Sequence, residues 1–273
     1  MAFEFSIWSQ FYNTKEPEEA ILEFEKDGLS HIELSSEHIT SLLEREGDLA
    51  EIGREFANFS LQHGVKILQA HIIFPSPIVT DKGEIDHIVR QLELLSTMGV
   101  RAGVLHCDEM MGTDATYEEK LRKNIDALKL LAPRAEKYGI TICLENMQRT
   151  FNSIDDLNYV IDEVGSDVFG ICLDTGHLNV TGTSSQRDFI LKAGKRLKAL
   201  HIANNDGTAD QHLAPFSRGN IDFFEVVGAL REIGYDGIFN YEIGGEAHPT
   251  PTHIKHIKYL AYKAGYDYLM SEA

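Results

Sequence analysis

Cysteine is scarce in this chain, and the few thiols present exclude two kinds of site. Cys107, Cys143 and Cys172 are an odd number, lie far apart and form no Cys-x-x-Cys pair. A disulfide framework and a thiolate zinc site both need paired cysteines, so the sequence indicates neither. Each cysteine lies within an apolar run, and we expect all three to be small buried core residues.

Long apolar runs and basic side chains are also lacking. No stretch approaches the roughly 18 apolar residues of a membrane-spanning helix, and the segment MAFEFSIWSQF contains neither a basic lead nor a cleavage-like site. Lys and Arg number 25 against 43 Asp and Glu, which gives a formal net charge of −18. Such a surface repels a polyanion and argues against nucleic acid as a partner. We expect a cytoplasmic protein that binds a small molecule, with no membrane association; the sequence leaves open whether it forms a homo-oligomer.

What the chain does contain is an alternation of β-rich and helical segments. Eight short β-rich runs recur, at 3–9, 31–36, 66–74, 102–108, 141–147, 169–175, 198–204 and 237–243. Helical periodicity appears between them, for example at 18–28, 48–64, 117–139 and 221–234. Pro133 falls inside the third of these helices, where it predicts a kink or a boundary.

Strands that alternate with helices predict right-handed βαβ units and a parallel sheet. Eight such units in 273 residues match an α/β fold of the (β/α)₈ TIM-barrel type, which typically has about 250 residues. The competing architecture is an open doubly wound sheet, but no Gly-x-Gly-x-x-Gly turn follows any of the runs. We therefore predict a single TIM-barrel domain over residues 1–273.

Polar side chains stand at the ends of nearly all the predicted strands. They are Glu33, His71, His106, Glu145, Asp174, His201 and Glu242, and the loops add His177, Asp210 and His212. A closed barrel brings the carboxyl ends of its strands to one mouth, where the active sites of this fold lie. Carboxylates buried side by side are costly unless a cation compensates them.

A subset of this ring has the composition of a metal site. It offers three oxygen ligands and one nitrogen ligand, from Glu145, Asp174, His201 and Glu242. This set predicts a divalent ion, with Mn²⁺, Mg²⁺ or Co²⁺ favoured and Zn²⁺ as an alternative. In the segment Asp-Thr-Gly-His, Gly176 would let the backbone turn sharply after the strand, before any helix begins. His177 would then return over the mouth to contact substrate or a second ion, or else cap the next helix.

Four segments carry a family resemblance. ICLENM, ICLDTGHLN, LHIANNDGTADQHLAPFSRGNIDF and GIFNYEI, in this order, resemble the xylose-isomerase-like barrel superfamily over nearly the whole chain. That superfamily includes sugar isomerases and epimerases and the endonuclease IV type of abasic-site nuclease. The resemblance implies that its metal ligands fall on Glu145, Asp174, His201 and Glu242. It also implies that Glu145 and Glu242 are the acid/base pair of a ketose epimerase.

Three positions depart from patterns of that superfamily. Phe151 and Gly207 stand where ketose 3-epimerases usually carry a further Glu and an Arg, so the sugar contacts of that subfamily do not transfer. Arg218 stands where an acidic residue is common. It would anchor an anionic or polyol group of the substrate, or remain an exposed loop charge.

These features favour a metal-dependent isomerase or epimerase that moves a proton next to the carbonyl of a sugar or cyclic polyol, through an ene-diolate. Substrate or a second metal ion would be bound by His71, His106, His177, Asp210, His212 and Arg218. Trp8 and Phe74 would offer apolar faces to the ring, and the Lys-free loops after the last two strands favour an unphosphorylated substrate.

Two other activities remain open. An endonuclease IV-like enzyme would hold three zinc ions with His71, His106, Glu145, Asp174, His177, His201, Asp210, His212 and Glu242. A lyase or dehydratase of the same superfamily would form the same ene-diolate but expel a leaving group.

Overall fold

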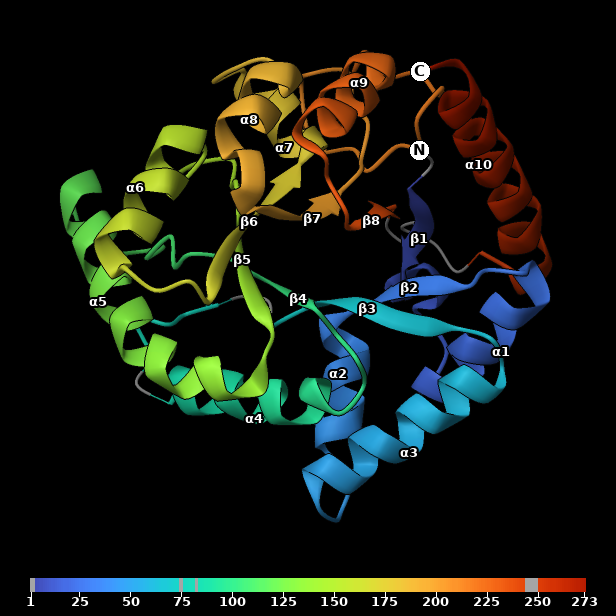
Figure 1. Cartoon of the computed structure of the whole chain (residues 1–273), viewed down its shortest axis with the longest axis horizontal. Helices are drawn as coiled ribbons and strands as arrows, with labels where there is room; N and C mark the ends of the chain where they lie inside the picture. The colour runs from blue at the N-terminus through green and yellow to red at the C-terminus, as the bar shows by residue number, and fades with distance from the viewer. Residues whose placement is uncertain (1–2, 74–75, 82, 244–249) are drawn as a thin grey trace.

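A nearly closed barrel of eight parallel strands forms the centre of the molecule (Figure 1). The structure is a computed structural model that describes residues 3–73, 76–81, 83–243 and 250–273. Its strands are β1 (Glu4–Trp8), β2 (His31–Leu34), β3 (Lys66–His71), β4 (Ala102–Leu105), β5 (Thr141–Glu145), β6 (Phe169–Asp174), β7 (Leu197–His201) and β8 (Ile238–Tyr241). The TIM-barrel prediction is confirmed, and each of the eight strands is shorter than predicted. Phe74, at the end of the third predicted run, lies outside the described residues.

The strands pair in the order β7-β6-β5-β4-β3-β2-β1-β8. At the remaining seam, β7 and β8 meet through an isolated parallel bridge between Ile202 and Tyr241. The Ile202 N–H donates to the Asn240 carbonyl at 2.8 Å, and the Glu242 N–H donates to the Ile202 carbonyl at 3.2 Å. Side-chain contacts therefore supply a larger share of the interactions between β7 and β8 than they do between strands joined by a continuous ladder.

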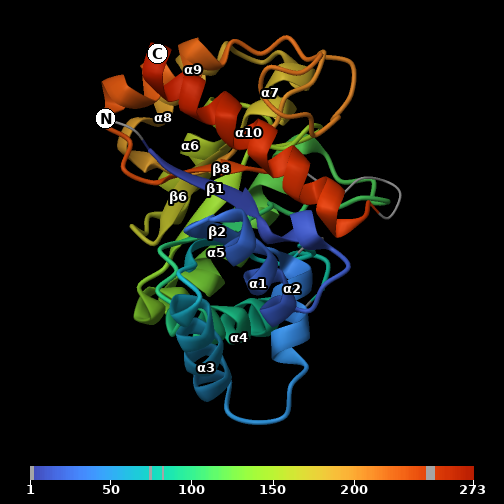
Figure 2. The same cartoon turned by 90° about the vertical axis from the view of Figure 1, so that its right-hand side faces the viewer.

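Helices form the outer layer, and Figure 2 shows α10 running past β1 and β8 on the outside of the barrel. The helices are α1 (Pro17–Asp27), α2 (Ser36–Leu43), α3 (Leu49–Gln62), α4 (Glu84–Ser96), α5 (Tyr117–Ala135), α6 (Ile154–Val164), α7 (Thr175–Thr181), α8 (Gln186–Ala193), α9 (Phe223–Ile233) and α10 (Thr252–Glu272), with 3₁₀ turns η1 (Ser9–Tyr12), η2 (Glu136–Tyr138) and η3 (Gly194–Arg196). The α-helical part of α5 ends two residues after Pro133 and continues as η2, so this proline marks a boundary. In the described part of the chain, no helix combines the length and the apolarity needed to cross a bilayer.

Small side chains fill the interior of the barrel. Ala102, Val104, Cys143, Cys172 and Ala199 form a buried cluster of their own, separate from the larger core between the sheet and the helices. All three cysteines are free and buried, as predicted. The lumen of an eight-stranded barrel holds only a few side chains per layer. These small residues occupy one layer, and the polar groups occupy the next layer, at the carboxyl ends of the strands.

Candidate metal and active site

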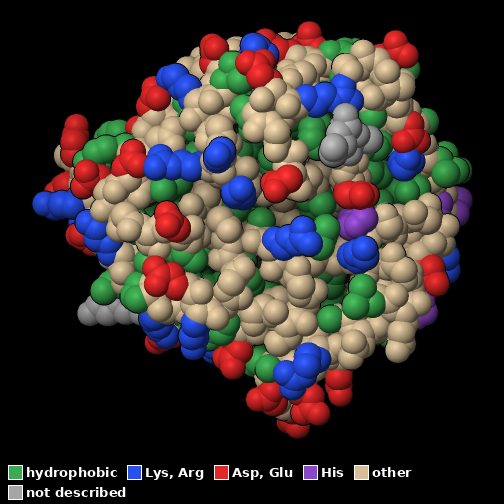
Figure 3. All heavy atoms as spheres, in the orientation of Figure 1, with side chains coloured by type: hydrophobic (Ala, Val, Ile, Leu, Met, Phe, Trp, Pro, Cys, Tyr) green, Lys and Arg blue, Asp and Glu red, His purple; other side chains and the backbone are tan. Residues whose placement is uncertain are grey.

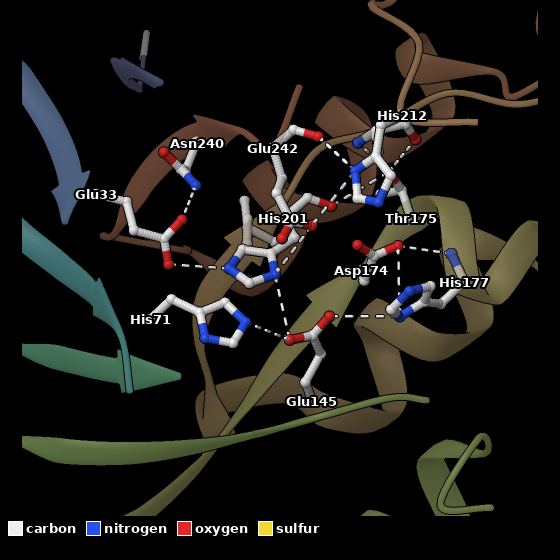
Figure 4. Close-up of polar contacts among 12 residues, drawn as sticks. Glu33, His71, Glu145, Asp174, Thr175, His177, His201, His212, Asn240 and Glu242 are labelled. Carbon is white, nitrogen blue, oxygen red and sulfur yellow. Dashed lines mark hydrogen bonds and ion pairs between the residues drawn. The ribbon is translucent and has the colours of Figure 1, made fainter. Parts of the chain in front are cut away.

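Four predicted residues converge at the carboxyl ends of the last four strands. Glu145, Asp174 and His201 are the final residues of β5, β6 and β7, and Glu242 directly follows β8. Each offers one ligand atom, and these four atoms all lie within 4.8 Å of one another. Three of the side chains are fully buried and Glu242 is 6% exposed. Figure 4 shows them pointing toward a common centre from separate sides of the barrel.

Each of the four side chains has one buried polar atom without a hydrogen-bond partner in the described part of the chain. These atoms are Glu145 Oε1, Asp174 Oδ2, His201 Nδ1 and Glu242 Oε2. Such atoms are rare in folded proteins because leaving them unsatisfied costs free energy. His201 Nδ1 lies 3.3 Å from Glu145 Oε2 and 3.4 Å from Glu242 Oε2. A divalent cation would satisfy all four groups at once, so the residues fit a metal site.

The two glutamates differ in proton affinity. Burial raises the pKa of Glu242 well above its usual value, and the nearby charges of Glu145 and Asp174 act in the same direction. Burial also acts to raise the pKa of Glu145, but the imidazoles of His201 and His106 outweigh it and lower that pKa well below the usual value. Two carboxyl groups with opposed shifts in one site are typical of an acid and base pair.

Asp174 has a second role that corrects a sequence expectation. Its Oδ1 accepts a hydrogen bond from the His177 N–H at 2.6 Å, which makes Asp174 the N-cap of α7. The helix therefore begins at Thr175, and the expected turn before any helix is wrong, because Asp174 itself caps the helix. Gly176 lies within the first turn of α7. His177 still faces the mouth, with Nδ1 3.0 Å from the Asn146 carbonyl oxygen.

Gly176 is required for close packing rather than for a turn. A Cβ at this position would lie 3.0 Å from Asn205 Nδ2 and 3.3 Å from Asp174 Oδ1. Gly176→Ala should therefore lower the free energy of unfolding by about 1–3 kcal/mol, the usual cost of overpacking, and displace the Asp174 carboxylate. Gly228→Ala in α9 is the matched control, since a Cβ there meets nothing within 4 Å. Urea unfolding of both variants tests this, and equal stabilities would contradict it.

The other predicted polar residues form a ring around this cluster. His106 Nε2 lies 2.9 Å and His71 Nε2 3.9 Å from Glu145 Oε2. Asp210 Oδ2 lies 3.3 Å from His177 Nε2 and 3.0 Å from His212 Nε2. Burial alone would lower the pKa of His212, but the hydrogen bond to Asp210 and the charge of Glu242 raise it to about 10.

A cavity of about 380 Å³ opens over these groups. It is lined by Trp8, Gln10, Ser36, Glu37, His71, His106, Glu145, Met147, Gln148, His177, Asp210, His212 and Glu242. Glu145 and Glu242 of the four-residue cluster line it together with four imidazoles, and its volume is in the range of small-molecule sites. Trp8 lines this cavity, as predicted for an apolar face. Gln10, Ser36, Glu37 and Gln148 are further polar residues that the strand-end pattern missed.

Arg218 is the one predicted site residue that the fold does not bring to the mouth. It is exposed and does not belong to the described cavity lining. The segment before it is fixed by an antiparallel bridge between Asn204 and Leu213, and the Ile221 N–H after it donates to Asn204 Oδ1 at 3.3 Å. These anchors leave Arg218 on the solvent side of the loop. This position agrees with the alternative of an exposed loop charge, and the role of substrate anchor stays a prediction.

Two buried residues hold members of this cluster in place: Asn146, which the sequence did not single out, and Glu33, which it placed at the mouth without a role. Asn146 clamps the backbone of Asp174: its Nδ2 donates to the Asp174 carbonyl at 3.0 Å, and its Oδ1 accepts from the Asp174 N–H at 2.8 Å. Glu33 Oε1 lies 2.9 Å from His201 Nε2. For Asn146 the sequence carried one signal, an amide directly after the predicted ligand Glu145. For Glu33 it carried no signal that His201 would be the partner.

Comparison with known proteins places this architecture in a family. The sequence model of the family described as "Xylose isomerase-like TIM barrel" matches residues 24–262. The chain belongs to this family. Among its relatives is an uncharacterized protein, MJ1311, of Methanocaldococcus jannaschii, which is 36% identical over 132 residues that cover 45% of this chain and 44% of that protein. The chain also resembles an inosose isomerase of Bacillus velezensis, with 24% identity over 233 residues and 80% of each chain covered.

Other relatives of this xylose isomerase-like barrel carry different names. A probable endonuclease 4 of Mycoplasmopsis agalactiae is 26% identical over 153 residues, which cover 52% of this chain and 54% of that protein. The chain spans about half the length of most of the curated relatives it matches. A solved structure of D-psicose 3-epimerase with D-tagatose from Clostridium cellulolyticum H10 superposes with a TM-score of 0.81 over 98% of this chain and 99% of that one. At 16% identity, that likeness concerns the fold.

Proposed function

We propose that this chain is a metal-dependent isomerase or epimerase of sugars, cyclic polyols or keto-sugars. One observation carries the proposal: four buried ligand-type residues, each with an unsatisfied polar atom, converge on one centre, and two of them, Glu145 and Glu242, line a cavity of about 380 Å³. The names of several relatives, including inosose isomerase and L-ribulose 3-epimerase, support it. We further propose that the protein acts in the cytoplasm as one barrel domain on an unphosphorylated substrate.

The metal would be held by Glu145, Asp174, His201 and Glu242, and the oxygen-rich set favours Mn²⁺, Mg²⁺ or Co²⁺, with Zn²⁺ as the alternative. When bound, a divalent ion would polarise the substrate carbonyl and stabilise negative charge on the ene-diolate oxygens.

The chain's own carboxylates would move the proton. Glu145 at the end of β5 and Glu242 after β8 reach the centre from separate sides of the mouth (Figure 4). One removes a proton from the carbon next to the carbonyl, and the other returns a proton. Their separate approach suits delivery to opposite faces of that carbon. His71, His106 and His177 lie around them, where their ring nitrogens would bind substrate hydroxyl groups.

A second candidate function rests on the outer ring. Asp210 lies between His177 and His212, and His106 and His71 lie beside Glu145, so nine ligand-type residues surround the mouth. This arrangement would suit a three-zinc abasic-site nuclease, and one relative is a probable endonuclease 4.

The charge distribution favours the isomerase over this nuclease. The net charge is −18, and Figure 3 shows acidic and basic side chains interspersed on one face of the molecule. The densest basic run, at 192–198, leads into the first residues of β7, at the opposite end of the strands from the mouth. DNA held at the mouth would need basic side chains there to pair with its phosphates.

Exchange of solvent hydrogen into carbon tests the proposed reaction. Metal-reconstituted protein is incubated in deuterated water with a panel of ketoses, inososes and keto-acids. We expect deuterium at the carbon next to the carbonyl together with an isomeric product, because the abstracted proton equilibrates with water. A dehydrated product would indicate the lyase alternative. Cleavage of abasic duplex DNA without exchange into any member of the panel would replace the proposal with the nuclease.

A further inference from the structure

A buried hydrogen-bond network stands behind His201, on the side away from the cavity. It consists of Ser6 on β1, Asn240 on β8, Glu33 on β2 and His201 on β7, and all four residues are fully buried. Ser6 Oγ donates to Asn240 Oδ1 at 2.8 Å, and Asn240 Nδ2 donates to Glu33 Oε2. Glu33 Oε1 lies 2.9 Å from His201 Nε2. Figure 4 shows Glu33 and the metal cluster on opposite sides of the imidazole.

The direction of these hydrogen bonds fixes the imidazole. Because Ser6 donates to the Asn240 oxygen, the Asn240 amide must present its N–H to Glu33. Glu33 therefore accepts at Oε2, and as a carboxylate it accepts at Oε1 as well. His201 therefore carries a proton on Nε2, and Nδ1 is the ring nitrogen that faces the cluster, 3.3 Å from Glu145 Oε2 and 3.4 Å from Glu242 Oε2.

We propose that Glu33 is a positioning residue for the metal site: it selects the His201 tautomer that can bind the ion and increases the basicity of the imidazole. The inference rests on the proposed metal site. Glu33 does not line the described cavity, so it is not placed to contact substrate. A carboxylate that accepts a hydrogen bond from the distal nitrogen of a metal-binding histidine is a recurrent arrangement in metalloproteins.

The same network spans the seam between β7 and β8. Asn240 belongs to β8 and His201 to β7, which meet through an isolated backbone bridge, and Glu33 joins the two side chains from β2. The ring of His201 is thereby fixed from the far side of the lumen. Burying a carboxylate costs free energy. A dication beside His201 would offset the negative charge of its direct ligands and, through the imidazole, that of Glu33 as well.

Metal affinity measured apart from activity tests this role. Calorimetric titration of metal-free protein with Mn²⁺ should show roughly 10-fold weaker binding for Glu33→Gln and up to about 100-fold weaker binding for Glu33→Ala, the range found when such outer partners are removed. The glutamine side chain can still accept a hydrogen bond from His201 but lacks the charge, which explains the smaller expected loss. Ring ¹⁵N and ¹H shifts of His201 in the metal-free protein should show a hydrogen-bonded Nε2–H in the wild type and a changed Nε2–H signal in Glu33→Ala.

Gln69→Met is the matched control. Gln69 is also buried, and its Nε2 donates to the Leu200 carbonyl next to His201 at 3.2 Å, but it does not bond the imidazole. We expect this variant to lose stability and to keep wild-type Mn²⁺ affinity. Equal affinities for wild type, Gln69→Met and both Glu33 variants, with an unchanged His201 Nε2–H signal, would overturn the role of Glu33 alone. Absence of Mn²⁺ binding to the wild type would overturn the metal site and this inference with it.

Discussion

Glu145→Gln and Glu242→Gln are each expected to lower kcat/KM by about 10³-fold or more, because each change removes a proton-transfer group and one ligand of the metal cluster. Glutamine keeps the size of the side chain but cannot accept the substrate proton. Steady-state assays with the substrate found by deuterium exchange measure the loss. Calorimetry with Mn²⁺ measures the part of it that arises from weaker metal binding.

Glu109→Gln is the control for these two variants. Its carboxylate accepts hydrogen bonds from the N–H and the hydroxyl of Thr150 at 3.2 and 3.3 Å, close to the mouth but outside the main cavity. We expect near-normal activity from this variant. Near-normal activity in Glu145→Gln or Glu242→Gln, with the fold intact by circular dichroism, would remove the proposed mechanism.

Stripping the protein of divalent ions is expected to abolish turnover and to lower its thermal stability. A ligand that binds only the folded state adds about 2.7 kcal/mol at 100 times its Kd, and the unsatisfied atoms of the four ligand residues would regain partners on binding. Thermal melts of chelated protein with increasing Mn²⁺, Mg²⁺, Co²⁺ or Zn²⁺ should therefore show a rising Tm, and activity should return with it.

Elemental analysis of the purified protein refines the same experiment. About one ion per chain would agree with the four-residue cluster. About three zinc ions per chain would favour the nuclease, since the outer groups around Asp210 and His71 would then be ligands as well. Full activity in chelated protein, with no change in Tm, would contradict both metal-dependent functions.

Several parts of the site could be read from local sequence because they depend on local rules. The β-rich runs and the helices between them identify a parallel barrel, and a barrel brings the carboxyl ends of its strands to one mouth. Glu145, Asp174 and His201 stand at those ends in the sequence and in the structure. Their convergence therefore follows from the fold class, without knowledge of any particular contact.

Other features depend on relations that no local pattern carries. Asp174 as a helix cap could have been recognised, since Asp is a favoured N-cap residue, but a ligand at a strand end was the competing interpretation. The structure leaves room for both, because Oδ1 caps the helix and Oδ2 has no hydrogen-bond partner among the described residues. Arg218 lies in a loop whose course is set by Asn204, which is 14 positions earlier, so its outward direction could not be inferred from its neighbours.

The sequence by itself determined the number and order of the strands, the burial of the cysteines and the ring of ligand-type residues, because period-two hydrophobicity and strand ends are local properties of the chain. Only the tertiary structure decided that Glu33 meets His201 across 168 positions and that Asn240 joins them. The reason is physical: the direction of a side chain inside a barrel depends on the register of all eight strands, and that register is fixed only when the sheet closes.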